Sequence, residues 1–340
     1  MQKSKLTRRD FLKASSLATA GVLGGVALSS RSARAASAPG PVLELKFAEI
    51  QPAQGIYARY ETKFGKLLEE RTGGAVKLAL FAGGALGGEK DVMEGLRLGS
   101  VHVGLMGLTL MPFLDVLSGP YIFRDEAHAR KVLDGEIGKS WQERVLKESG
   151  GLRLIDYVYF GPRQLTTKRT PGRTPAELKG LKIRVQEIPI HIAIWKALGA
   201  NPVPMAWPEV FTGLQQGTIE AQENPLELVI SNSLFEVQKY ATLTAHVRPH
   251  RFLLMNDAVF KKMTPEQQKI FVDTWKGISK EVETEYIASD QKYIETLKAK
   301  GMTIVQPDIN AYKEATKDVW KEFMPKAWGP GVYEKVEAVK

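Results

Sequence analysis

The segment from Leu181 to Asn224, "LKIRVQEIPIHIAIWKALGANPVPMAWPEVFTGLQQGTIEAQEN", decides the fold class. Its apolar start, "LKIRV", predicts a strand, and "IPIHIAIWKALGA" predicts a helix. An extended stretch ("NPVPM"), a helix ("PEVFTGLQQG") and a strand ("TIEAQEN") follow. Strands that alternate with helices of this length indicate an α/β fold with a largely parallel sheet.

The same alternation precedes this segment. "LELKFAEI" (43–50) alternates apolar and polar residues and predicts a strand. "VKLALF" (76–81) and "VHVGLM" (101–106) predict two more strands, with a short helix between them. The helix expected before Gly73 has one apolar face, made of Tyr57, Tyr60, Phe64, Leu67 and Leu68.

Two capping boxes predict helix starts. "TPAE" (174–177) places Thr, Pro and Glu as a capping box with Pro at the first helical position, and its short helix is expected to end at Gly180. "TPEQ" (264–267) begins a pattern that continues to about Lys300 without Pro, and Gly277 is its only glycine. A helix of that length exceeds the usual domain helix, so we expect it to bridge two domains.

The N-terminus predicts an exported protein. "TRRDFLK" (7–13) matches a twin-arginine signal and precedes a weakly apolar stretch, Leu17–Leu28, which is too short for a lasting membrane span. Ala33-Arg34-Ala35 fits a cleavage site, and Ala36-Ser37-Ala38 is an alternative.

Removing this signal changes the charge argument. The 340-residue chain has a net charge of +9, but residues 1–35 hold seven Lys/Arg and one Asp, which leaves 40 basic and 37 acidic residues. A net charge of +3 gives no reason to expect nucleic acid as a partner. The apolar content of 44% is enough for a real core.

The sequence gives no support for metal, cofactor or enzyme chemistry. It has no cysteine, which excludes disulfides, thiolate metal sites and catalytic thiols. His246 and His250 have the i, i+4 spacing of zinc ligands, but Pro249 lies between them and Arg248 and Arg251 would repel a cation. No G-x-S-x-G motif is present. The glycines from Gly83 to Gly88 lack the G-K-[ST] of a phosphate loop and indicate a strand-to-helix turn.

Four residues are suited to holding an anion. Arg184 lies inside an apolar strand and Arg163 follows a Gly-Pro turn, and both offer planar forks for a carboxylate. Asn224 offers an amide, although a helix N-cap before Pro225 is the alternative interpretation. Trp207 precedes Pro208 at a helix start, where a packing aromatic is the alternative.

The chain resembles the periplasmic solute-binding proteins of TRAP (tripartite ATP-independent periplasmic) transporters, of the DctP type. The resemblance rests on "GPRQLTT", "ELKGLKIRV", "FEVQKYATLTAH", "GGALGGEKDVMEGLRLGSVHVGL" and, above all, "LGANPVPMAWPEVFTGLQQGTIEAQENPL". It covers essentially the whole chain after the signal. It implies an α/β fold of two lobes, each with a mixed sheet flanked by helices, and one long helix that spans both.

The resemblance also implies site residues. Arg184 matches the arginine that pairs with the ligand carboxylate, Arg163 a second anion contact, and Asn224 an amide on the same carboxylate. Trp207 matches an aromatic that packs on the ligand, and His246 lies where members place a pocket residue. The weaker matches are Glu49 and Gln51, on the loop after the first strand.

We therefore expect a non-enzymatic binding protein in the periplasm that delivers an organic acid anion to the small and large membrane subunits of a transporter. A C4-dicarboxylate, a sugar acid or a small sulfonate would suit these arginines. The alternatives are a sensing module for a receptor and a periplasmic enzyme acting on a carboxylate. The expected division is residues 1–35 as signal, 41–160 with 250–289 as lobe I, and 161–249 with 290–340 as lobe II.

Overall fold

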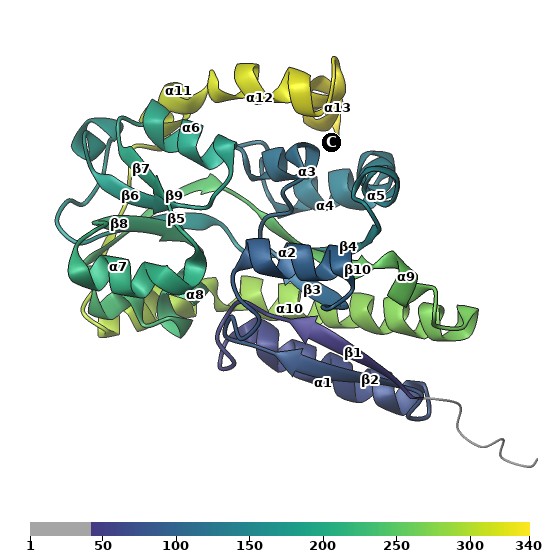
Figure 1. Ribbon diagram of the computed structural model, residues 1–340. Coiled ribbons are helices and arrows are strands. Elements are labelled where there is room, and N and C mark those ends of the chain that lie inside the picture. Colours follow the sequence, from purple (N-terminus) through teal and green to yellow (C-terminus); the bar gives the residue numbers. More distant parts are fainter. Residues whose placement is uncertain (1–41) are drawn as a thin grey trace, which may run out of the picture. The chain divides into compact units, whose positions relative to one another are not determined.

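The computed structural model describes residues 42–340. The predicted signal at residues 1–35 lies outside the described residues. The described strands form two sheets, which we call the lobe I sheet and the lobe II sheet (Figure 1).

The lobe I sheet has the strand order β2-β1-β3-β10-β4. Its strands are β1 (Leu43–Ala48), β2 (Val76–Phe81), β3 (Val103–Met106), β4 (Leu152–Tyr159) and β10 (His250–Asn256). β1 is parallel to β2 and β3, and β10 is antiparallel to β3 and β4. Alternate residues of β10 enter different cores, Phe252 and Leu254 on one face and Leu253 and Met255 on the other. Both faces of this sheet are therefore covered.

The lobe II sheet has the order β11-β9-β5-β8-β6-β7. Its strands are β5 (Arg163–Thr167), β6 (Lys182–Val185), β7 (Asn201–Pro204), β8 (Ala221–Asn224), β9 (Tyr240–Val247) and β11 (Thr303–Val305). β6 is parallel to β7 and β8, and β11 is parallel to β9, whereas β5 is antiparallel to β8 and β9.

The expectation of a largely parallel sheet is wrong, because both sheets are mixed. The parallel strands are those joined through helices, as the alternation predicts. The antiparallel ones come from the two crossings between lobes, β4 to β5 and β9 to β10, where the chain passes from one sheet to the other with no helix between.

The helices pack around these sheets. The α-helices of lobe I are α1 (Ile56–Arg71), α2 (Glu89–Leu98), α3 (Pro112–Asp115), α4 (Glu126–Asp134), α5 (Glu136–Glu148) and α9 (Asp257–Phe260). Those that follow lobe II strands are α6 (Pro189–Ala197), α7 (Val210–Gln216) and α8 (Leu226–Ser231). The last ones are α10 (Pro265–Ala299), α11 (Ile309–Thr316), α12 (Val319–Ala327) and α13 (Val332–Ala338). Short 3-10 helices are η1 (Val116–Ser118), η2 (Pro175–Leu178), η3 (Trp207–Glu209) and η4 (Leu234–Glu236).

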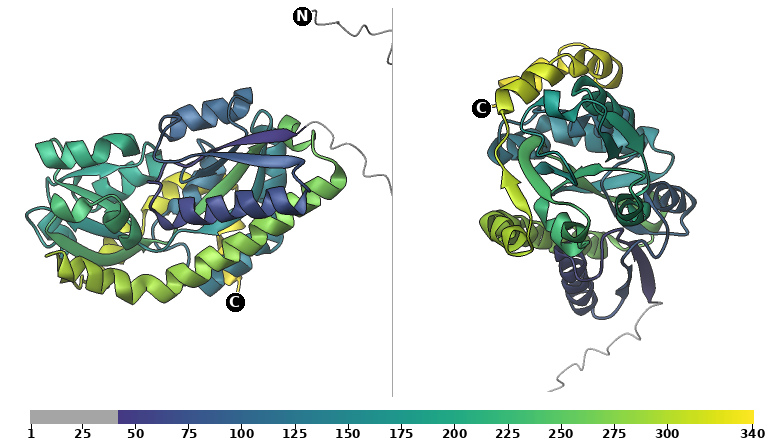
Figure 2. Two further views of the ribbon diagram at one scale, coloured as in Figure 1. Left: turned by 90° about the horizontal axis from the view of Figure 1, so that it is seen from below. Right: turned by 90° about the vertical axis from the view of Figure 1, so that its left-hand side faces the viewer.

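The long helix α10 spans both lobes, as predicted. Its start is a formed capping box, in which the Thr264 side chain accepts from Gln267 N. Near this end Phe271 and Trp275 pack edge-on against Phe64 of α1, each with ring centroids 5.1 Å apart. At the other end Leu297 lies in the core that α7 and α8 share. Figure 2 shows α1 lying alongside the first part of α10. The predicted two-lobed α/β fold is confirmed.

The C-terminal helices contact both lobes. Tyr312 of α11 donates to Gly172 O in lobe II. Trp328, after α12, stacks on Trp141 of α5 with centroids 4.9 Å apart and donates to Phe113 O at 2.7 Å. Residues 319–340 thus pack against residues 112–148, although the predicted division places 290–340 in lobe II. That division stays a prediction.

No helix among residues 42–340 is both long and apolar enough to cross a bilayer.

Candidate functional site

A small cavity lies between the two lobes. Lobe I and lobe II side chains both line it: Ile50, Gln51, Glu89, Gly107, Phe160 and Arg251 from the first, and Arg163, Arg184, Gln186, Trp207 and Asn224 from the second. Several of them follow the carboxyl ends of strands, which is where α/β sheets bind ligands. The cavity leaves only about 20 Å³ to the centres of water molecules, close to the minimum for one water. A larger solute can enter only if the lobes separate.

Arg184 is a buried cation held by a backbone carbonyl. Its side chain is 4% exposed, and its Nε and Nη2 donate to Met205 O at 2.9 and 2.7 Å. Among residues 42–340 no carboxylate oxygen lies within 4.0 Å of its nitrogens. Burial lowers the pKa of Arg184 to about 10, and the nearby charge of Arg163 acts in the same direction. The group stays charged at neutral pH, so the site is prepared for an anion.

Arg163, by contrast, already has a carboxylate. Its Nε and Nη2 donate to both oxygens of Glu223, and Nη2 also donates to the Glu223 carbonyl at 2.6 Å. Burial would raise the pKa of the Glu223 carboxyl, but the charge of Arg163 and a hydrogen bond from His246 hold that pKa well below its usual range. Both side chains are 1% exposed. Arg163 therefore carries little net charge toward the cavity.

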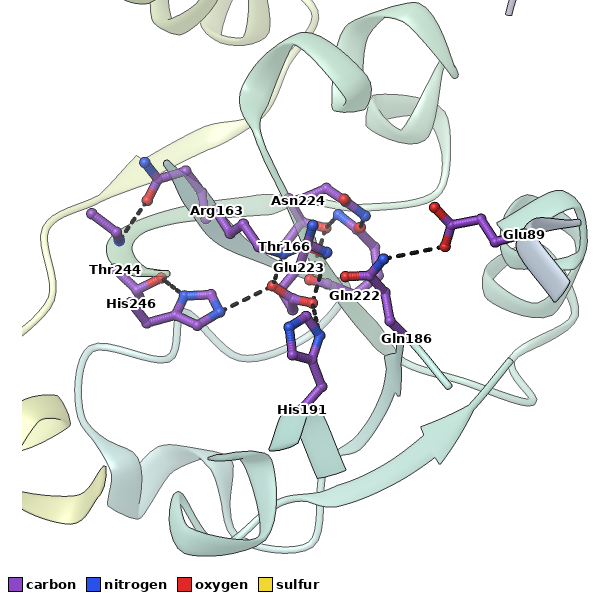
Figure 3. Close-up of polar contacts among 12 residues, drawn as sticks. Glu89, Arg163, Thr166, Gln186, His191, Gln222, Glu223, Asn224, Thr244 and His246 are labelled. Atoms are coloured by element: carbon purple, nitrogen blue, oxygen red, sulfur yellow. Dashed lines mark hydrogen bonds and ion pairs between the residues drawn. The ribbon is translucent and has the colours of Figure 1, made fainter. Parts of the chain in front are cut away.

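His246 supports this pair from behind. Its Nε2 lies 3.0 Å from Glu223 Oε2, and its Nδ1 lies 2.8 Å from Thr244 Oγ1. A carboxylate can only accept, so Nε2 donates to Glu223. Figure 3 shows Glu223 between Arg163 and the rings of His246 and His191. Burial lowers the pKa of His191 to about 3, so this imidazole is neutral.

Arg251 forms a second buried pair on the lobe I side. Its Nη1 and Nη2 donate to the two oxygens of Glu49, both at 2.8 Å, and Nη2 also donates to Leu105 O. Its guanidinium lies over the rings of Tyr57 and Phe160. Burial would lower the pKa of Arg251, but the charge of Glu49 outweighs burial and holds it above its usual value.

Glu89 is the remaining charged group that lines the cavity. Its Oε1 accepts from the backbone N–H of Gly107 and Leu108. Its Oε2 lies 3.4 Å from Gln186 Nε2 of lobe II. Burial raises the pKa of the Glu89 carboxyl, and the two backbone donors oppose that shift by favouring the carboxylate. Glu89 thus reaches across the cavity from one lobe to the other.

The structure brings five of the seven predicted site residues together at the cavity: Arg184, Arg163, Asn224, Trp207 and Gln51. The other two, Glu49 and His246, lie behind the cavity. Glu49 binds Arg251, and His246 binds Glu223, the partner of Arg163. Asn224 does not cap a helix, because Pro225 is the N-cap of α8 and the Asn224 amide donates to Gln222 Oε1 at 2.7 Å. The Arg184 guanidinium lies 5.4 Å from the ring centre of half-buried Trp207.

The sequence contained signals for two residues that the prediction missed. Arg251 lies in an apolar strand, just as Arg184 does, and it is 1% exposed. Glu89 directly follows the glycine-rich turn at residues 83–88. Gln186 comes two residues after Arg184 and carries no signal of its own.

Comparison with known proteins identifies the family. The model of the bacterial extracellular solute-binding proteins, family 7 (DctP), matches residues 47–327. This chain belongs to the DctP family. It is a TRAP periplasmic solute-binding protein, which confirms the resemblance seen in the sequence, and proteins of this family are periplasmic.

Three relatives illustrate the match. The 2,3-diketo-L-gulonate-binding periplasmic protein YiaO of Escherichia coli (strain K12) is 39% identical over 259 residues, 74% of this chain and 78% of YiaO. A TRAP periplasmic solute-binding protein from Roseobacter denitrificans, solved with bound L-galactonate, is 32% identical, with a TM-score of 0.83 over 88% of this chain and 99% of that one. One from Pseudomonas putida F1 with bound D-glucuronate is also 32% identical, with a TM-score of 0.83 over 88% and 98%.

Proposed function

We propose that this DctP protein binds a small organic acid anion between its lobes and delivers it to the membrane subunits of a TRAP transporter. The observation that carries the proposal is Arg184, a buried guanidinium at the cavity with no carboxylate within 4.0 Å among residues 42–340. Burying an unpaired charge costs stability. A ligand carboxylate would supply the missing partner and would favour the closed arrangement.

The relatives favour a sugar acid among the anions that suit the site. L-Galactonate and D-glucuronate, bound in two of the solved structures, each combine a carboxylate with several hydroxyl groups. The cavity offers matching chemistry, since Arg184 is a carboxylate partner and Glu89, Gln51 and Gln186 are hydroxyl partners. Asn224 would bind the same carboxylate as Arg184, and Trp207 would pack on the carbon chain.

Arg163, Glu49 and His246 take supporting parts in this proposal. Arg163 meets the ligand as a hydrogen-bond donor whose charge Glu223 has already balanced. His246 orients Glu223, and Glu49 orients Arg251. No chemical step is assigned to any of them, so the protein acts by binding and not as an enzyme. We also propose export by the twin-arginine route, with cleavage after Ala35 or, at the alternative site, after Ala38. The proposed lobes are 41–160 plus 250–289 and 161–249 plus 290–340.

A thermal-shift screen tests the proposal. The mature protein is heated with each member of a panel of C4 to C6 sugar acids, C4-dicarboxylates and small sulfonates. A ligand at one hundred times its Kd stabilises the folded state by about 2.7 kcal/mol, which raises the melting temperature by several degrees. The same panel is run on Arg184→Ala. Shifts of equal size in both proteins, or none in wild type, would contradict the proposal.

A further inference from the structure

The charges around the cavity are separated between the lobes. On the lobe II side Glu223 balances Arg163 at ion-pair distance, while Arg184 has only the carbonyl of Met205. His191 is neutral because burial lowers its pKa, and His246 lies behind Glu223, outside the residues that line the cavity. The lobe II wall therefore presents one net positive charge, located at Arg184.

The lobe I wall has the opposite balance. Glu49 matches Arg251 with two hydrogen bonds of 2.8 Å, so this arginine has no surplus charge to offer. Glu89 remains, with its carboxylate held by two backbone N–H groups and no cation within 4.0 Å among residues 42–340. The neighbouring cation Lys90 pairs instead with Glu187 at 2.6 Å, outside the cavity lining. The lobe I wall therefore presents one net negative charge.

From this separation we infer that the cavity selects monocarboxylates with hydroxyl groups at the far end and rejects dicarboxylates of the same length. One carboxylate can meet Arg184, but a second one that reached the lobe I wall would face Glu89 and an arginine that is already paired. A hydroxyl in the same place donates to Glu89 and accepts from Gln51 or Gln186. Like charges placed together in a buried site are a recognised source of specificity. The inference rests on the proposed function and narrows its ligand class.

Matched pairs of acids test this selection. D-Erythronate and meso-tartrate differ only in the far terminus, which is CH2OH in the first and a carboxylate in the second. L-Galactonate and galactarate differ in the same way at six carbons. Calorimetry measures the affinity of the mature protein for all four acids at pH 7.5. In the pair whose chain length fits the cavity, the dicarboxylate should bind at least 30-fold more weakly than the monocarboxylate.

Two variants identify the charge that is responsible. Glu89→Gln keeps the shape and removes the net negative charge, so the preference for the monocarboxylate should fall at least tenfold. Glu94→Gln removes an exposed carboxylate of the same helix, outside the lining, and should leave the preference unchanged.

The outcomes separate the two proposals. Equal affinities within the pair that binds, or an unchanged preference in Glu89→Gln, would overturn the inference and leave the proposed function intact. Binding of a dicarboxylate with no detectable binding of its partner would do the same. If none of the four acids binds, the inference fails together with a sugar acid as the ligand, while the wider screen still decides whether another anion binds.

Discussion

Two buried arginines of the lobe II sheet differ in whether a carboxylate balances their charge. Arg163 is fixed by Glu223, a partner 60 residues away, whereas Arg184 has only a carbonyl to bind. Stability and binding therefore depend on different residues of one cavity. Arg184 is the one whose removal should affect the ligand and spare the fold.

We expect Arg184→Ala to lose ligand affinity by about 30-fold to several thousand-fold, since a desolvated carboxylate without its partner costs about 2–5 kcal/mol. Arg184→Lys should recover only part of the lost ligand affinity, because an ammonium group cannot form the two parallel hydrogen bonds of a guanidinium. Without ligand, the Ala variant should melt no lower than wild type, since it removes an unpaired buried charge. Calorimetry and thermal melts measure both effects.

Arg163→Ala is the matched control for that experiment. It leaves Glu223 buried without its cation, and breaking a buried pair in this way costs about 3–5 kcal/mol. Its melting temperature without ligand should therefore fall clearly below that of Arg184→Ala. The opposite order of the two melting temperatures would contradict the assignment of their charges.

Glu61 should make stability depend on pH. It is 1% exposed, and neither carboxyl oxygen has a hydrogen-bond partner among residues 42–340. Burial, and then the charge of Glu49, raise the pKa of Glu61 well above 4.5. Its contribution to stability is complete below about pH 4.5 and is lost as the pH rises toward the folded pKa, because the unfolded chain releases the proton first.

Glu61→Gln keeps the shape of the side chain and cannot ionise, so it should remove this loss of stability at higher pH. The variant should gain about 1.4 kcal/mol over wild type for each pH unit above 4.5 until the folded pKa is reached. Urea unfolding at pH 4, 6 and 8 measures the difference. Burial raises the pKa of Asp115 and of Glu227 to about 7. Both residues are present in wild type and in the variant, so their contributions cancel in the difference in unfolding free energy. A difference that is the same at all three pH values would refute the idea.

At the scale of the element, α10 connects the lobes, and its length comes from packing at both ends. An isolated helix gains little from length alone, and most of its stability comes from buried side chains. Phe271 and Trp275 are buried in lobe I and Leu297 in lobe II. Between them lies Gly277, which is exposed, and a Cβ there would meet no atom within 4 Å.

Gly277→Ala should stabilise the protein by about 0.5–1 kcal/mol, because glycine in a helix interior has more freedom to lose on folding. The melting temperature should rise by about 1–3 °C. Gly301→Ala is the control: this glycine follows the end of the same helix, also with open space, but its φ is +88°, so alanine there should destabilise. A loss of ligand affinity in Gly277→Ala would instead show that α10 bends at this point during closure.

For the whole molecule, the described arrangement is closed over its site. Residues of both walls are buried, and the volume left at their centre, about 20 Å³, is too small for a sugar acid. Lys90–Glu187 and Glu89–Gln186 also join the lobes directly. Binding therefore requires opening first, and the ligand must then favour closure through its own contacts.

Small-angle X-ray scattering of the mature protein should show a smaller radius of gyration with the saturating acid from the thermal screen than without it. Arg184→Ala at the same acid concentration is the control and should keep the larger radius. An unchanged profile for wild type would indicate a rigid site and would contradict hinge closure.

Export is a property of the complete chain. Replacing Arg8-Arg9 with Lys-Lys should leave unprocessed precursor in the cytoplasm, since the twin-arginine route depends on that pair. Fractionation and immunoblotting measure processing, with the unchanged signal as the control. Normal processing of either protein in cells without a twin-arginine pathway would exclude this route.

The sequence by itself determined most of the helices and strands and the presence of an anion-binding arginine. Helix–strand alternation, the start of α10 and an arginine inside an apolar strand are local features, so neighbours in the chain are enough to predict them. The two predicted capping boxes differ, however. "TPEQ" forms its capping box at the start of the long α10, whereas "TPAE" begins only the 3-10 helix η2, where Glu177 accepts from Arg173 N instead.

Only the tertiary structure decided which arginine lacks a partner. Arg184 and Arg251 have the same signature in sequence, a fixed charge in a buried strand. Glu49 is 202 residues from Arg251 and reaches it because β1 and β10 both pair with β3. Sheet pairing over such distances is set by the whole fold and not by local propensity. The charge that attracts the ligand is therefore the one for which folding brings no carboxylate.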